Sequence, residues 1–151
     1  MTNAVRVGIL VGSESDLPVM AATGEVLDTY GIGWEIGVMS AHRAGDVVRA
    51  YALAASDRGL RVLVAGAGAA AHLPGVVASL TKLPVLGVPP AAPHPAGLHS
   101  LLSIDQTTAR LIAVTPTPAT TDTGSARDRA AAYVRRMTTT ARACDQREAH
   151  P

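Results

Sequence analysis

One four-residue segment, Ser40-Ala41-His42-Arg43, carries a hydroxyl, an imidazole and a guanidinium close together. An imidazole both gives and takes a proton near neutral pH, and a guanidinium binds a phosphate or carboxylate through its planar fork. Taken alone, a histidine more often only makes a hydrogen bond, and an arginine more often lies on the surface. Because an apolar run that predicts a strand precedes the segment, we expect these residues at a strand end, with His42 as the acid–base residue.

A second polar segment, Gly12-Ser13-Glu14-Ser15-Asp16, follows the apolar run at residues 5–11. Two hydroxyls beside a helix N-terminus suit a phosphate, and a carboxylate suits a ribose diol. The alternative is helix capping, for which Asp16 is well placed at the start of the next helix. The sequence leaves both interpretations open, and they are compatible.

A third segment, residues 65–75, joins an apolar run at residues 61–64 to a predicted helix at residues 76–80. Its glycines and alanines allow close approach to the backbone and present N–H groups near a helix N-terminus, as a small anion requires. The alternative is a tight turn that packs the helix on a sheet. His72, within this loop, either lines the same cavity or fixes the loop.

Composition narrows the function classes. The net charge is +1, so neither a nucleic-acid stripe nor a membrane patch is indicated, and the apolar stretch at residues 62–92 is interrupted too often to span a membrane. The single cysteine, Cys144, excludes an internal disulfide and a cysteine-based metal cluster. We expect no metal, because three histidines lack a companion at ligand spacing: His94, His99 and His150. With no charged segment and apolar signal core at the start, a cytoplasmic location is expected.

A Ser-His-Asp hydrolase built from Ser40, His42 and Asp16 is also disfavoured. Such enzymes usually carry a Gly-x-Ser-x-Gly elbow, which the sequence lacks.

Strands and helices alternate along the chain. The patterns predict strands at residues 5–11, 34–39, 61–64, 84–88 and 110–115, and helices at 17–30, 47–55, 76–80, 98–102 and 125–141. This alternation indicates a parallel α/β sheet covered by helices on both faces, in one domain over residues 1–141 with a polar tail at 142–151. Ligands of such sheets bind beyond the carboxyl ends of the strands, where the three polar segments are expected to converge.

Together with Leu-Pro-Val-Leu-Gly-Val-Pro at residues 83–89, the three segments resemble the N5-carboxyaminoimidazole ribonucleotide mutase family of purine biosynthesis. This family is also called the catalytic subunit of aminoimidazole ribonucleotide carboxylase. The order and spacing agree over residues 5–89. Four motifs in register are specific, whereas any one of them is not.

The resemblance implies a flavodoxin-like, doubly wound three-layer fold, an octamer with active sites at subunit junctions, and no metal or cofactor. It implies that a carboxylate leaves the exocyclic nitrogen of an aminoimidazole ribonucleotide as CO2 in a closed pocket and is recaptured at the ring carbon, with His42 shuttling the proton. By the same resemblance Ser13 and Asp16 hold the ribose phosphate end, and Ser40 and Arg43 contact the phosphate. The other implied substrate-binding residues are Gly12, Ser15, Ala41, Ala67, Gly68, Ala69, His72 and Leu73, of which those from 67 onward enclose the carboxylate and CO2.

The later part of the chain departs from the family pattern. Residues 107–113 and 123–129 stand where the family usually has Met-Pro-x-Gly-x-Pro-Val and Gly-x-x-Asn-Ala-Ala. Two alternatives follow: a carboxylase or decarboxylase of a different heterocycle in specialised metabolism, and a non-catalytic nucleotide-binding protein. A pure binding protein would not need His42. A mean hydropathy of +0.23 favours helix faces covered by other subunits, hence a homo-oligomer.

Overall fold

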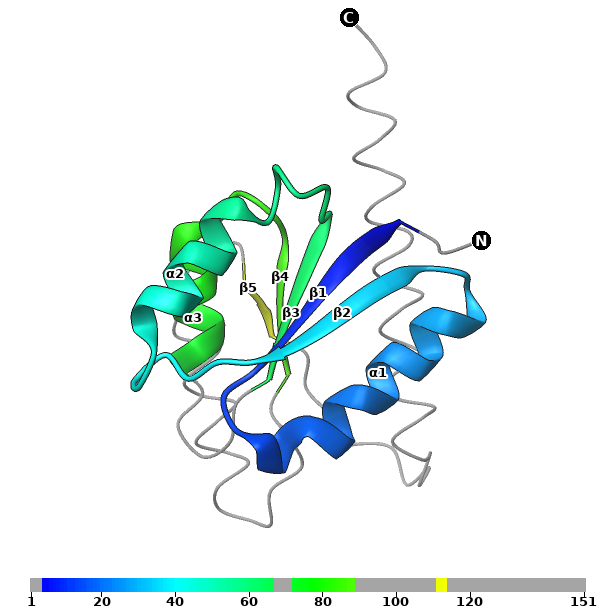
Figure 1. Ribbon diagram of the computed structural model, residues 1–151, viewed down its shortest axis with the longest axis horizontal. Coiled ribbons are helices and arrows are strands. Elements are labelled where there is room, and N and C mark those ends of the chain that lie inside the picture. The colour runs from blue at the N-terminus through cyan, green and yellow to red at the C-terminus, as the bar shows by residue number, and fades with distance from the viewer. Residues whose placement is uncertain (1–3, 67–71, 89–110, 114–151) are drawn as a thin grey trace, which may run out of the picture.

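A five-stranded parallel sheet in the order β2-β1-β3-β4-β5 forms the centre of the molecule (Figure 1). The computed structural model describes residues 4–66, 72–88 and 111–113. The elements are β1 Val5–Val11, a short 3-10 turn Glu14–Asp16, α1 Leu17–Thr29, β2 Gly33–Val38, α2 Gly45–Ala54, β3 Val62–Gly66, α3 His72–Leu80, β4 Val85–Val88 and β5 Leu111–Ala113. This strand order is that of the flavodoxin-like doubly wound fold, which confirms the predicted class.

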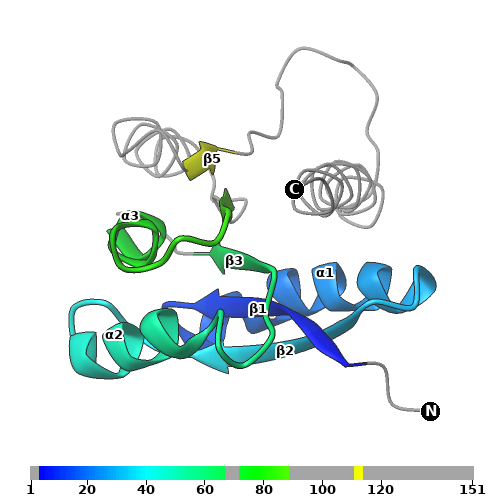
Figure 2. The same cartoon turned by 90° about the horizontal axis from the view of Figure 1, so that it is seen from above.

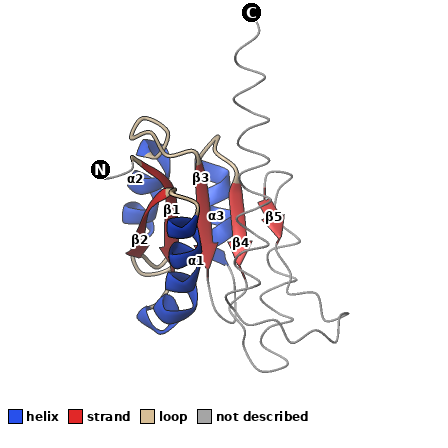
Figure 3. Cartoon of the chain, turned by 90° about the vertical axis from the view of Figure 1, so that its right-hand side faces the viewer, coloured by secondary structure: helices blue, strands red, loops and turns tan. Residues whose placement is uncertain are grey.

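Helices cover both faces of the sheet. Figure 2 shows α2 and α3 together on one face and α1 on the other, and Figure 3 shows the same layers from the side. Alternate residues of each central strand point to opposite faces, so Ile9 and Val64 pack toward α1 while Leu10 and Leu63 pack toward α2 and α3. Two hydrophobic cores therefore hold one sheet between them.

The two central strands are buried along most of their length. In β1 all residues from Val7 to Val11 are buried, and in β3 all five residues are. Continuous β-branched and leucine runs are what a strand covered on both faces requires, and the parallel register pairs Ile9 with both Ile36 and Val64. Among the described residues, no helix is long and apolar enough to cross a bilayer.

Element boundaries agree with the sequence prediction to within a few residues, with one larger difference. The predicted end of the first helix is confirmed, since α1 ends at Thr29 and Gly31, just after the C-cap residue Tyr30, adopts φ 65°. Helix α3, in contrast, begins at His72, four residues before the predicted start. Pro74 lies in its first turn, where a missing N–H costs nothing, so it does not end the helix.

The predicted helices at 98–102 and 125–141 and the tail at 142–151 lie outside the described residues. Of the predicted strand at 110–115, the structure describes β5, which pairs in parallel with β4.

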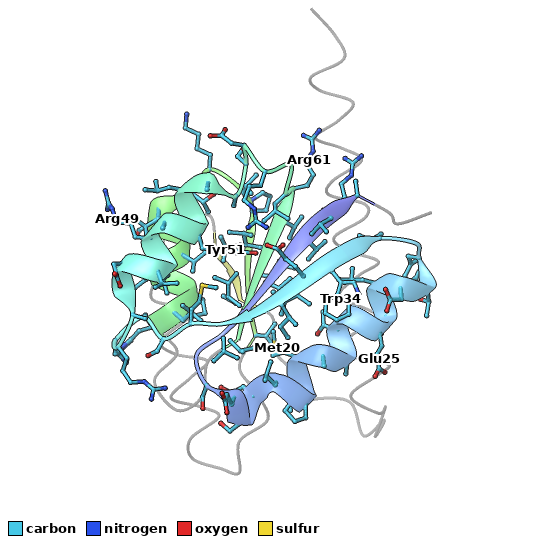
Figure 4. The ribbon with its side chains drawn as sticks, in the orientation of Figure 1. Met20, Glu25, Trp34, Arg49, Tyr51 and Arg61 are labelled. Carbon is cyan, nitrogen blue, oxygen red and sulfur yellow. The ribbon has the colours of Figure 1, made fainter. Side chains whose placement is uncertain are left out.

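A network of three polar side chains joins the partly buried edge strand β2 to α2 and to the residues that follow α2. Tyr51 donates a hydrogen bond to Glu35 Oε1 at 2.7 Å, and Arg58 Nη2 donates to Glu35 Oε2 at 2.6 Å. The Tyr51 side chain reaches from α2 across the sheet (Figure 4), over Gly8, where any Cβ would collide with its hydroxyl. Burial raises the pKa of Glu35, but the hydrogen bonds from Arg58 and Tyr51 outweigh it, so the net pKa is lowered.

Glu35→Gln tests this network because it keeps the size and an acceptor for Tyr51 but removes the charge. At pH 7 we expect the free energy of unfolding to fall by up to about 1 kcal/mol, the contribution of a partly exposed ion pair. A carboxyl group with a lowered folded pKa stabilises above its unfolded pKa of about 4.3 and loses that contribution as the pH falls through the folded value. The difference between parent and variant should therefore narrow as the pH falls below about 4.3.

Urea unfolding of both proteins at pH 7 and at about pH 3.5 measures this difference. Glu25→Gln on the exposed surface of α1 is the matched control and should change the free energy of unfolding by less than about 0.5 kcal/mol at both values. A Glu35→Gln difference that is the same at both values would show that the charge contributes nothing.

Candidate functional site

The carboxyl ends of β1, β2 and β3 lie at one edge of the sheet (Figure 1). Two backbone hydrogen bonds continue the pairing just beyond these strands: Gly12 N–H donates to Gly66 C=O at 3.1 Å, and Met39 N–H donates to Val11 C=O at 2.8 Å. The first polar segment therefore begins directly between the other two. The chain passes to opposite faces after β1 and β3, which makes this point the topological switch of the sheet, where α/β folds bind ligands.

The first segment is shaped by its own hydroxyls. Ser13 Oγ accepts hydrogen bonds from Ser15 N–H at 3.4 Å and from the Ser15 hydroxyl at 3.0 Å, and it caps the 3-10 turn that leads into α1. The capping alternative applies to Ser13; Asp16 is the N-cap residue of α1, as the sequence predicted, but its side chain makes no capping hydrogen bond. The backbone of Asp16 is already helical, so its carboxylate is not directed at the N–H groups that follow.

The second segment is a tight turn that ends in two exposed side chains. Ser40 Oγ accepts a hydrogen bond from Arg43 N–H at 3.3 Å, and Ser40 C=O accepts one from Ala44 N–H at 2.9 Å. His42 and Arg43 are both exposed at its tip. Within the described ranges Arg58–Glu35 is the only ion pair, so the Arg43 guanidinium has no carboxylate partner there.

The third segment contributes His72, whose ring meets that of His42. His42 Nε2 lies 2.9 Å from His72 Nδ1, and the rings are edge to face, with centroids 5.1 Å apart and planes at 84°. In a neutral pair one nitrogen donates and the other accepts, so the tautomer decides whether the outer nitrogen of His42 is a base or an acid. Both rings are exposed, and a proton can be exchanged with a bound molecule or with water.

The sequence predicted that His72 lies in a loop, and this is wrong: His72 is the first residue of α3. The next residue, Leu73, is 2% exposed and belongs to the core under the helix. The predicted cradle residues Ala67, Gly68 and Ala69 lie outside the described residues. The structure thus brings together the residues around His42, Ser13 and His72 at one edge, and the role of each remains a prediction.

Sequence spacing gave no signal for the histidine pair, since 30 residues separate its members. The fold supplies the contact, because β2 and β3 lie on either side of β1, and His42, which follows β2, meets His72 at the start of α3. No group of three or more histidine, cysteine, aspartate or glutamate side chains converges in the part of the chain that the structure describes.

A hollow of about 500 Å³ lies at the opposite edge of the sheet. Arg6 at the start of β1 and Arg58 and Arg61 between α2 and β3 line it, and Figure 4 shows Arg61 far from the carboxyl ends of the strands. It is therefore separate from the histidine pair.

The sequence is similar to those of known proteins. The chain is 55% identical over 101 residues to the N5-carboxyaminoimidazole ribonucleotide mutase of Thermotoga maritima, a match that covers 67% of this chain and 59% of the relative. It is 52% identical over 99 residues to the chloroplastic phosphoribosylaminoimidazole carboxylase of Vigna aconitifolia, covering 66% of this chain and 18% of that one. The matched part thus spans less than two thirds of either relative's length.

A solved structure shows the same fold. The crystal structure of Treponema denticola PurE superposes with a TM-score of 0.66 at 23% identity, covering 89% of this chain and 80% of that one. Residues 6–147 match the family described as AIR carboxylase. Since this match includes nearly the whole sequence, the chain belongs to the AIR carboxylase family.

Proposed function

We propose that this protein moves a carboxylate from the exocyclic nitrogen of an aminoimidazole ribonucleotide to the neighbouring ring carbon, as a mutase of purine biosynthesis. The observation that carries the proposal is the exposed His42 ring at the switch point of the sheet, hydrogen bonded to His72 at 2.9 Å. The identity of 55% to a protein named N5-carboxyaminoimidazole ribonucleotide mutase supports it. The cytoplasm is the proposed compartment, because a charged ribonucleotide does not cross a membrane unaided.

The reaction balances with one acid–base group. Cleavage of the N–C bond of the N-carboxylate releases CO2, and the nitrogen takes a proton. The ring carbon, made electron-rich by the amino group, then attacks the CO2 and afterwards loses its own proton. One proton thus moves from carbon to nitrogen, so a single imidazole that gives and later recovers a proton suffices, and no electrons are exchanged with an outside group.

The remaining polar groups would bind and orient the substrate. Arg43 has no carboxylate partner within the described ranges and would hold the phosphate through its planar fork. The carboxylate of Asp16 makes no capping hydrogen bond and would accept hydrogen bonds from the ribose diol. The Gly- and Ala-rich residues that follow β3 in the sequence would enclose the CO2 and keep it from escaping into water.

A second candidate is direct carboxylation by dissolved CO2, favoured by the 52% identity to a protein named phosphoribosylaminoimidazole carboxylase. An isotope experiment separates the two. N-carboxylated substrate labelled with ¹³C is supplied with excess unlabelled bicarbonate, and the product is read by mass spectrometry. Retained label supports the mutase, and complete loss of label supports the carboxylase. If neither the N-carboxylated ribonucleotide nor the aminoimidazole ribonucleotide with bicarbonate is converted, the alternative of a different heterocycle is favoured.

His42→Ala is expected to lower turnover by about 10²–10⁴-fold, the usual contribution of a positioned acid–base group. Added imidazole should restore part of the rate, because it replaces the missing proton carrier, while an unfolded variant would not respond. Steady-state absorbance assays with and without imidazole measure this, with the thermal midpoint as a check on folding. Full activity of the variant would contradict the assignment, and ribonucleotide binding without turnover in the parent would favour a non-catalytic binding protein.

Asp16→Asn is expected to raise KM by about tenfold or more, since it removes a charged acceptor from the ribose diol, whereas kcat changes less. The control is Asp46→Asn, which removes a carboxylate that lies in the first turn of α2 and has no role in the proposed binding of the substrate. Both variants lose a similar interaction with a helix N-terminus, about 0.3–1 kcal/mol of stability. Equal KM values for the two variants would show that Asp16 does not bind the substrate.

We further propose a homo-oligomer, and by family resemblance an octamer. Apolar side chains that are well exposed on the single chain support contacts between subunits: Val19, Val38, Val47 and Leu53. Light scattering coupled to size exclusion measures the mass, and about eight times 15.4 kDa is expected. A monomer at micromolar concentration would contradict the proposal, and Leu53→Glu is expected to shift the mass toward smaller species.

A further inference from the structure

The facing nitrogens of His42 and His72 have the spacing of two ligands on one metal ion. Imidazole nitrogens bind first-row transition ions at about 2.0–2.1 Å. Two such ligands at a right angle are about 2.9 Å apart, and at the tetrahedral angle about 3.4 Å apart. The observed separation of 2.9 Å equals the right-angle value.

We propose that His42 and His72 form a two-histidine site for a divalent first-row transition ion, and that a bound ion inhibits the enzyme. A right angle between two nitrogen ligands is typical of the tetragonal coordination of Cu²⁺ and Ni²⁺. Imidazole ligands also favour these ions and Zn²⁺ over Mg²⁺ and Ca²⁺. The binding part of the proposal is independent of the activity, while the inhibition rests on the proposed function.

The two imidazole rings need to turn only a little to bind one ion together. In the hydrogen bond one nitrogen points along the line to the other, whereas in the complex each lone pair must turn about 45° from that line toward the ion. Both rings are exposed, so they can turn without disturbing the core, and water can fill the other coordination positions. The proton between the rings moves to the outer nitrogen of the ring that carried it, so a neutral pair releases no proton and no electron is transferred.

The inhibition follows from the same lone pair. An ion on His42 Nε2 holds one ring nitrogen and makes the ring a poorer base, so His42 cannot accept a proton at the rate that turnover requires. It also fixes the ring by way of His72, across the edge where the substrate would bind. The ion is thus an inhibitor in this proposal and takes no part in the reaction.

The experiment uses the full chain, stripped of metal by a chelator, in a background that removes other ligands. In this background four side chains are replaced by serine or asparagine: Cys144, His94, His99 and His150. Ni²⁺ and Zn²⁺ affinities are measured by competition with a chromophoric chelator, with Mg²⁺ as the negative control. We expect one ion per chain, and a loss of at least about tenfold in affinity, or about 1.4 kcal/mol, on His42→Asn or His72→Asn.

Copper electron paramagnetic resonance on the background protein needs no further variant. Nitrogen hyperfine splitting from two imidazoles supports the pair. Splitting from one or none, or an affinity that His72→Asn leaves unchanged in a folded protein, would overturn the site. Circular dichroism checks that each variant is folded.

A measurement of turnover with and without Ni²⁺ separates the proposed inhibition from the proposed mutase function. Turnover of the background protein should fall as Ni²⁺ fills the site and return when a chelator removes it. A filled site with unchanged turnover would overturn the inhibition. Absence of turnover in the metal-free protein would instead count against the mutase function and leave the binding result standing.

Discussion

Backbone pairing between β1 and its two neighbours is the constraint on which the site depends. The order β2-β1-β3 places three strand ends side by side, and the bonds Gly12 N–H to Gly66 C=O and Met39 N–H to Val11 C=O extend this pairing into the loops. Segments some 30 residues apart in the sequence, as Ser13, His42 and His72 are, start from adjacent points. The geometry at the edge is therefore set by the sheet, and the loops need only short turns to complete it.

The sheet can hold this geometry because its register is fixed from both faces. Residues of β1 alternate between the core under α1, as Ile9 does, and the core under α2 and α3, as Leu10 does. A shift by one residue would reverse every side chain, and since both faces are packed no alternative register is tolerated. Gly8 adds a local constraint, because the Tyr51 hydroxyl occupies the space of a Cβ on its way to Glu35.

Much of this fold is predictable from the sequence, and the exceptions have physical causes. The buried run of β1, the end of α1 before Gly31 and the parallel alternation are local patterns, and the structure confirms them. The start of α3 was placed four residues too late because residues 65–75 were predicted as one Gly- and Ala-rich loop, whereas Pro74 lies in the first turn of the helix and has no hydrogen bond to lose there. The contact of His42 with His72 depends on which strands are neighbours, and no spacing rule along the chain contains that information.

The hydroxyls of Ser13 and Ser40 differ from the charged groups of the site in what they contact. Ser13 Oγ and Ser40 Oγ each accept hydrogen bonds from N–H or O–H groups of their own turns, so their lone pairs shape the backbone. A serine that accepts in this way still has its own O–H to donate. In the proposed function both hydroxyls donate to an acceptor such as a phosphate oxygen, and Arg43 supplies the charge. The same hydroxyls therefore shape the turns and are also suited to an anion, so the structural and the binding interpretation of these segments are compatible.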